Sequence, residues 1–350
     1  MMSVPPDFES WTPLLAAAKE RIEKYKPADR TDDQLLRPSL EAFLKWLPRG
    51  GRDNVARDIF EATSDDALHQ VFQNLLLGLA TPSKLTLGVL VAARARYEIS
   101  QDSPEPLDFK HQSEKKESKF RDLVMRRDSF SCVITGDMDT EAWMNLDNPI
   151  DIPYCTALAT HILPFSFAAW NKSLGLPDSR LSPWELLYRC FPRLRRAGLR
   201  AETIDTPLNG ILLRYNLQAA FKRNQIAFKS TGTENRYEVI TFEGYLQQDR
   251  RRLPNSGLVV LRLPLEEDGM EELDLPSPAI LDCHWRLVEI LNETRIAPAL
   301  CRHFDEWKNL KKTYHGLAED GSTDAAKYVR AGLWGVGDGD VSFAQSHPWT

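Results

Sequence analysis

One feature most constrains the fold: short apolar segments, far apart in the chain, that alternate with polar turns. The first segment, Ser131–Gly136, reads SCVITG and is predicted to be a strand that ends in a turn. A second strand is predicted over Thr156–Pro164, with His161 near its end and the proline closing it. Residues Asn209–Phe221 are predicted to be a helix entry followed by a helix. Together these segments predict a small α+β unit whose parts are separated in sequence by a long spacer.

Helical patterns flank this unit on its N-terminal side, where apolar residues recur at helical spacing and Ser64 has the position of an N-cap. The spacer, 165–206, is aromatic-rich and too long to lack structure, so it should hold its own helices. The expected organisation is a helical N-terminal region over 1–100, a polar linker over 101–118, the α+β module over 119–245 with its insertion 165–206, a C-terminal strand and helices over 246–320 that pack on the module, and a flexible tail over 321–350.

Composition narrows the class of protein. The chain has 350 residues, 42% of them hydrophobic, as expected for a globular protein. Its net charge of −6 argues against nucleic-acid binding as the main task, although local patches matter more than the total. No apolar run is long enough for a membrane span, and the N-terminus does not resemble a secretory signal. The five cysteines are scattered, which predicts reduced thiols and an intracellular, cytoplasmic protein.

Five short motifs occur in one order: CVITG at Cys132–Gly136, ATHILPF at Ala159–Phe165, PLNGILL at Pro207–Leu213, LQAAF at Leu217–Phe221, and IAF at Ile226–Phe228. In this order they resemble the HNH nuclease domain of many fungal proteins, whose pattern starts with arginine-aspartate. The resemblance implies a ββα-metal module, in which two strands form a hairpin and a helix packs across it. It also implies that His161 is the general base, that Asn209 orients it, and that a helix residue holds one divalent metal.

Three residues depart from that pattern. Gln218 stands where the resemblance calls for a helix histidine, Lys222 stands where Asp or Gly is usual, and Thr160 replaces a frequent carboxylate. A neutral amide is a poor ligand for transition metals, and a lysine beside a cation costs on the order of a few kcal/mol. We therefore expect no bound metal and a lost or crippled nuclease. Plainer interpretations stay open: a structural His161, a turn at Asn209, and a solvated helix edge at Gln218 and Lys222.

The first functional hypothesis is an enzyme of fungal specialised metabolism that uses no metal or other cofactor. The chain is similar in kind to the norbornene-forming Diels–Alderase of sordarin-type biosynthesis, which implies a Diels–Alder-type [4+2] cyclisation of an apolar terpenoid. Such a site needs a shaped apolar pocket and hydrogen-bond donors to a carbonyl. The predicted catalytic residues are His161, Asn209, Gln218 and Lys222, and the predicted substrate-binding residues are Phe165, Trp170 and Trp184. These aromatic residues fit an ordinary core equally well.

Two other hypotheses remain. The chain could be a divergent HNH endonuclease that uses Mg²⁺ or another divalent metal, with nucleic acid as its partner. It would then recruit Asn216, Gln218 or an acidic residue such as Asp205 to the metal, and the arginines of 193–196 and 250–252 could meet phosphates. The third hypothesis is a binding protein that uses the fold as a scaffold and has no chemistry.

Overall fold

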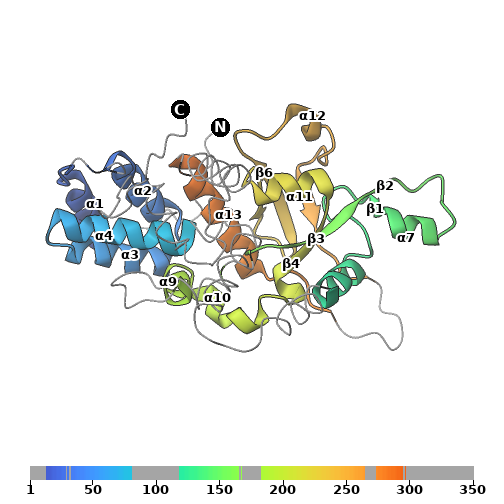
Figure 1. Cartoon of the computed structure of the whole chain (residues 1–350), viewed down its shortest axis with the longest axis horizontal. Coiled ribbons are helices and arrows are strands. Elements are labelled where there is room, and N and C mark those ends of the chain that lie inside the picture. The colour runs from blue at the N-terminus through green and yellow to red at the C-terminus, as the bar shows by residue number, and fades with distance from the viewer. Residues whose placement is uncertain are drawn as a thin grey trace, which may run out of the picture.

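The computed structural model describes residues 13–28, 30, 33–80, 118–164, 167, 183–264, 273–294 and 296. These residues form helices and small sheets, so the predicted α+β class is confirmed. Helices occupy one end of the molecule, and β1, α7 and β2 lie at the other (Figure 1). The predicted linker 101–118, except for its last residue, and the predicted tail 321–350 lie outside the described residues. No helix in the described ranges is long and apolar enough to cross a membrane.

Within the described residues, the N-terminal part contains four α-helices, whose apolar residues recur at helical spacing and meet in one core. Ile22, Leu40, Phe43, Leu68 and Phe72 are buried there. The predicted N-cap is confirmed, since the Ser64 hydroxyl accepts a hydrogen bond from the Ala67 N–H at 3.1 Å. The elements are α1 (Pro13–Glu23), α2 (Asp33–Trp46), α3 (Arg49–Glu61), α4 (Asp65–Leu75) and the π-helical turn η1 (Leu76–Ala80).

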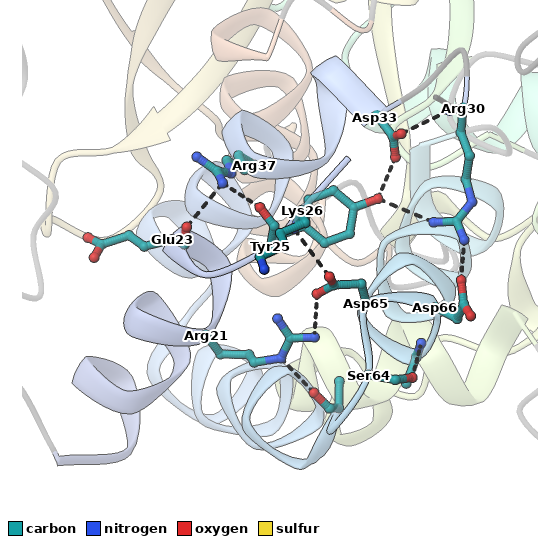
Figure 2. A network of polar contacts seen from close by, with 12 residues as sticks. Arg21, Glu23, Tyr25, Lys26, Arg30, Asp33, Arg37, Ser64, Asp65 and Asp66 are labelled. Carbon is teal, nitrogen blue, oxygen red and sulfur yellow. Dashed lines mark hydrogen bonds and ion pairs between the residues drawn. The ribbon is translucent and has the colours of Figure 1, made fainter. Parts of the chain in front are cut away.

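A polar network ties the end of α1 to the start of α2 (Figure 2). The buried Asp33 carboxylate accepts hydrogen bonds from the Tyr25 hydroxyl and from the backbone N–H groups of Ala28 and Arg30, the last two at 2.7 and 2.9 Å. Burial, together with the bond to Asp33, raises the pKa of Tyr25 to about 12. Burial alone would raise the pKa of Asp33, but its three hydrogen bonds outweigh that effect and lower it.

The same network reaches α4. The Arg21 guanidinium donates to the Ala62 carbonyl at 2.7 Å and pairs with Asp65 at 3.0 Å (Figure 2). Arg30 pairs with Asp66 in the first turn of α4. Both carboxylates lie at the positive end of the α4 dipole, where negative charge is stabilising. The N-terminal helices are therefore joined by polar contacts at one end as well as by their apolar core.

The centre of the molecule is an antiparallel hairpin of β3 (Ala157–His161) and β4 (Gly210–Arg214), in register from Ala157 opposite Arg214 to His161 opposite Gly210. Helix α11 (Tyr215–Lys222) follows β4 directly and packs on both strands. The strand predicted over Thr156–Pro164 is thus confirmed in β3. The prediction of a helix entry from Asn209 was wrong for 210–214, which form β4.

The strand predicted over Ser131–Gly136 was also wrong. Only Ser131 forms a bridge, to Met138, and the residues after it make a turn. The Gly136 N–H donates to the Cys132 carbonyl at 2.8 Å, and Gly136 has a φ of +75°, which glycine adopts without strain. Apolar content alone therefore did not distinguish a strand from a buried turn. The strand that pairs with β3 comes instead from the far side of the spacer.

Between His161 and β4 the spacer holds short helices, as predicted for its described residues, and a second sheet follows the hairpin. The described spacer elements are α9 (Pro183–Cys190), α10 (Pro192–Arg196) and η2 (Ala201–Thr203), and η3 (Pro207–Asn209) lies between the spacer and β4. Strands β5 (Ile226–Ser230), β6 (Arg236–Thr241) and β7 (Leu258–Val260) make an antiparallel sheet in the order β5-β6-β7, and α12 (Gln247–Arg250) lies between β6 and β7 in sequence.

Helix α13 (Pro278–Glu293) joins the two ends of the molecule (Figure 1). It packs on β5 and on α2. On one side the His284 ring stacks on Phe221 of α11, with ring centroids 4.0 Å apart. On the other, Trp285 meets Trp46 of α2 edge to face at 6.0 Å, and the Arg286 guanidinium donates to the Trp46 carbonyl at 2.8 Å. Helix α13 therefore connects α11, which covers the central hairpin, to the N-terminal helices.

Candidate functional site

His161 lies at the end of β3 and is held by a charged and an aromatic neighbour. Its Nε2 is 2.9 Å from Oδ1 of Asp205, which follows η2, and the two side chains are each 21% exposed. The ring of Phe120 lies flat on the His161 ring, with centroids 3.9 Å apart and planes 4° apart. A carboxylate bound at Nε2 places the proton on that nitrogen in the neutral ring and leaves the lone pair on Nδ1.

Gly210, opposite His161 in the hairpin, makes this stacking possible. A Cβ at position 210 would lie 2.5 Å from Val124 and 2.9 Å from Phe120, both on the helix over 118–127. Any larger residue would push that helix, and with it the Phe120 ring, away from the hairpin. The glycine of the Asn-Gly step is thus required by a close approach, since its φ is −124° and needs no special freedom.

A buried ion pair fixes the start of β4. The Arg127 and Asp128 side chains are 0% and 3% exposed and bond to each other at 2.8 Å. Arg127 also donates to the carbonyls of Pro207 and Gly210 at 2.5 and 2.8 Å, and Asp128 accepts from the Leu212 N–H at 2.8 Å. The sequence predicted for Arg127 no more than a place in or beside a short basic helix. The arginine-aspartate step that opens the HNH pattern was the signal that could have identified this pair.

Asn209 is fully buried and bonds to backbone only. Its Oδ1 accepts from the Leu163 N–H at 2.8 Å, and its Nδ2 donates to the carbonyls of Leu163 and Ile204 at 2.9 and 3.0 Å. Leu163 lies two residues after His161, and Ile204 lies directly before Asp205. One side chain therefore holds both segments that bring His161 and Asp205 together. The predicted direct hydrogen bond from Asn209 to the ring is replaced by this indirect arrangement.

The predicted α11 residues differ in their surroundings. Gln218 is buried and makes no side-chain hydrogen bond within the described part of the chain, whereas Lys222 is exposed. The neighbouring positions Leu217 and Phe221 point into the core. Asn216 is exposed. Gln218 is thus a buried amide rather than part of a solvated edge, and it stands on the helix that covers the hairpin.

The predicted substrate-binding residues are only partly described. Phe165 and Trp170 lie outside the described residues. Trp184, on α9, is buried and packs against Phe167 and Tyr188, with ring centroids 6.4 and 5.6 Å apart. Its indole Nε1 is buried and has no hydrogen-bond partner among the described residues. These contacts are those of a core residue, and a role for Trp184 in a pocket stays a prediction.

The donor set can be compared with what an HNH metal site needs. His161 and Asp205 bring one imidazole and one carboxylate together. In the described ranges no group of three or more His, Cys, Asp or Glu side chains is placed to hold a metal ion. The Thr160 hydroxyl, at the frequent carboxylate position, donates to the Leu158 carbonyl at 3.1 Å. With Gln218 on the helix, these residues fit a transition metal poorly, because a neutral amide is a weak ligand for it and one imidazole and one carboxylate are the remaining donors among the described residues of this site.

The hairpin, its bracing arginine-aspartate pair and the covering helix agree with a comparison to known families. A family model described as HNH endonuclease matches residues 132–229. Neither the search of curated proteins nor that of solved structures gave a match. The matched range runs from the turn after the helix 118–127 through β5 and covers less than a third of the chain. Over residues 132–229 the chain is therefore similar to an HNH endonuclease domain, in agreement with the order of its motifs.

Proposed function

We propose that this HNH-family module works without a divalent metal, as an enzyme of fungal specialised metabolism that acts on a small apolar molecule. One observation carries the proposal. The frame that positions His161 is complete, from Arg127 and Asp128 to Asn209, while the helix position of the metal ligand is the buried amide of Gln218. An HNH-like module that lacks the helix histidine suits a reaction that requires positioned hydrogen-bonding groups, because such a reaction needs no metal ion as a Lewis acid.

The reaction we propose is a Diels–Alder-type [4+2] cyclisation of a terpenoid. Such a reaction converts three π bonds into two σ bonds and one π bond, so no proton or electron has to leave the substrate. The protein has to hold diene and dienophile together and to stabilise negative charge on a dienophile carbonyl. Gln218 and Lys222 carry N–H donors for that carbonyl. His161, held by Asp205 at Nε2, is the third polar side chain that we assign to the substrate site.

A divergent divalent-metal-dependent endonuclease is the second candidate, and the pairing of Asp205 with His161 favours it. A carboxylate 2.9 Å from the imidazole is a hard oxygen ligand, and with phosphate oxygens and water it could complete a Mg²⁺ shell. His161 would then be held by the metal or act as the base, and Gln218 would be a bystander. This candidate agrees with the family match over 132–229.

A plasmid-cleavage assay separates the two candidates. We expect the purified protein to leave supercoiled DNA intact with Mg²⁺, Mn²⁺ or Ni²⁺. Metal-dependent cleavage that disappears in His161→Ala and persists in the control Phe60→Ser, on the N-terminal helices, would refute the metal-free proposal. The cyclisation itself is tested by incubating the protein with a linear or monocyclic terpenoid that carries a diene and an enal. Accelerated formation of one stereoisomer, lost in Gln218→Ala, supports it, and product formation at the buffer rate contradicts it.

A further inference from the structure

The segment from β1 (Met138–Asp139) through α7 (Thr140–Asn145) to β2 (Tyr154–Cys155) stands out from the body of the molecule (Figure 1). We call residues 138–155 the protrusion. It lies at the end of the molecule opposite the N-terminal helices, and β1 and β2 pair in parallel at its base. None of its residues takes part in the contacts described above for His161.

Internal contacts fix the shape of the protrusion. The Trp143 indole donates to the Pro149 carbonyl at 3.0 Å, and its ring stacks on Tyr154 with centroids 4.2 Å apart. At the base, Asp139 caps α7 by accepting from the Glu141 N–H at 3.1 Å and also accepts from the Ala157 N–H at 3.1 Å. The side chains of the protrusion are thus presented on an ordered scaffold, which lowers the entropic cost of binding a partner.

Large apolar side chains are exposed together on this scaffold. Ile150 is 98% exposed, Met144 58%, Leu146 56% and Tyr154 54%. Tyr215, at the start of α11, is 60% exposed as well, and its N–H donates to the Thr156 carbonyl just after β2. Single exposed apolar residues are ordinary, but a cluster of them on a soluble domain marks an interaction surface. The aromatic stack and the aliphatic side chains beside it provide the centre of such a surface.

Acidic residues alternate in sequence with these exposed apolar residues. Residues 137–155 contain five Asp or Glu and no Lys, Arg or His. Asp137 is used by Arg214 and Asp139 by the cap of α7, whereas Glu141, Asp147 and Asp151 are exposed. Negative charge around an apolar centre repels nucleic acid and anionic lipid and attracts lysine and arginine.

We propose that the protrusion is a docking surface for a protein segment that combines aliphatic or aromatic side chains with lysine or arginine. The apolar residues of the partner would cover Met144, Leu146 and Ile150, and its basic residues would meet the exposed carboxylates. The charge pattern selects this occupant, because an apolar partner without positive charge would leave three carboxylates beside a desolvated surface. This inference does not depend on the chemistry at His161.

Selection from a random peptide library tests the proposal. The full-length protein is the target, and a Met144→Ser/Ile150→Ser variant is used to remove peptides that bind elsewhere. We expect the selected peptides to share lysine or arginine with Leu, Ile, Phe or Trp. In fluorescence anisotropy, the best peptide should bind the double variant at least about tenfold more weakly, because two anchoring side chains are lost. A Glu141→Lys/Asp147→Lys/Asp151→Lys variant should weaken binding and flatten its salt dependence.

Phe60→Ser is the matched control, because Phe60 is 55% exposed on α3 and belongs to the N-terminal helices. It should leave peptide binding unchanged, and Ile150→Ser should leave the thermal unfolding curve unchanged because Ile150 is fully exposed. Selected peptides without basic residues, no enrichment over the variant, or equal binding to the variant would each overturn the proposal. A concentration-dependent dimer that Ile150→Ser abolishes would overturn it in favour of a second copy of this chain.

Discussion

Replacement of Asn209 by alanine tests how the site is held. The substitution removes three hydrogen bonds, one from the Leu163 N–H and two to the carbonyls of Leu163 and Ile204. A net contribution of about 1 kcal/mol for each bond gives a loss of about 3 kcal/mol in the free energy of unfolding. The loss should not be smaller, because these backbone groups are left buried without a partner in a site where the asparagine is 0% exposed.

Urea unfolding followed by tryptophan fluorescence measures this loss. Asn216→Ala is the control, because Asn216 is an exposed amide on the neighbouring helix and should change stability by no more than about 0.5 kcal/mol. Histidine-edited NMR gives a second readout: the His161 resonances should shift in Asn209→Ala, while those of His69 on α4 stay in place. A loss below about 1 kcal/mol with unchanged His161 resonances would refute the reasoning that Asn209 positions the two segments.

Two further predictions concern charges. Arg127→Met removes the hydrogen bonds to the Pro207 and Gly210 carbonyls and leaves the buried Asp128 carboxylate without its ion-pair partner. We expect urea unfolding to show a loss of about 3–5 kcal/mol in the free energy of unfolding. The control Arg121→Met, at an exposed arginine, should change this free energy little. Because the pKa of folded Asp33 lies below its ordinary 3.8, its contribution to stability is complete above that pH and disappears as the pH falls through the lowered value. The stability difference between wild type and Asp33→Asn should therefore shrink below about pH 4 in acid-unfolding curves, and a constant difference would contradict it.

Some of this architecture follows from local sequence and some does not. Apolar residues at helical spacing predict helices where α1, α2, α4 and α13 lie, whereas the more polar α3 carries a weaker pattern and was not singled out. Residues 210–214 read as a helix entry because Asn-Gly is a frequent turn and the apolar run after it is short. They form a strand because β3, which precedes them by about fifty residues, offers a partner in register. Local sequence propensities do not predict that long-range pairing.

The candidate site, too, was only partly predictable from the sequence. The motif order identified His161, Asn209 and Gln218. The Asp205 carboxylate was considered only as a metal ligand, because a contact across 44 residues of sequence carries no local signal. The indirect role of Asn209 was likewise beyond the sequence, since an asparagine that bonds to a ring and one that bonds to backbone look identical in a motif. Contacts made by residues of the spacer, such as that of Asp205 with His161, become visible only in the folded structure.

We propose that the HNH-like module binds no divalent metal, because Gln218 stands where the resemblance calls for a helix histidine. Isothermal titration of metal-free protein with Mn²⁺ and Ni²⁺, for wild type and for Gln218→His/Lys222→Asp, tests it most directly. We expect no stoichiometric binding to wild type and one site in the double variant, because His161, Asp205 and the residues that position them are unchanged there. Stoichiometric binding to wild type that is lost in His161→Ala or Asp205→Ala would contradict the account.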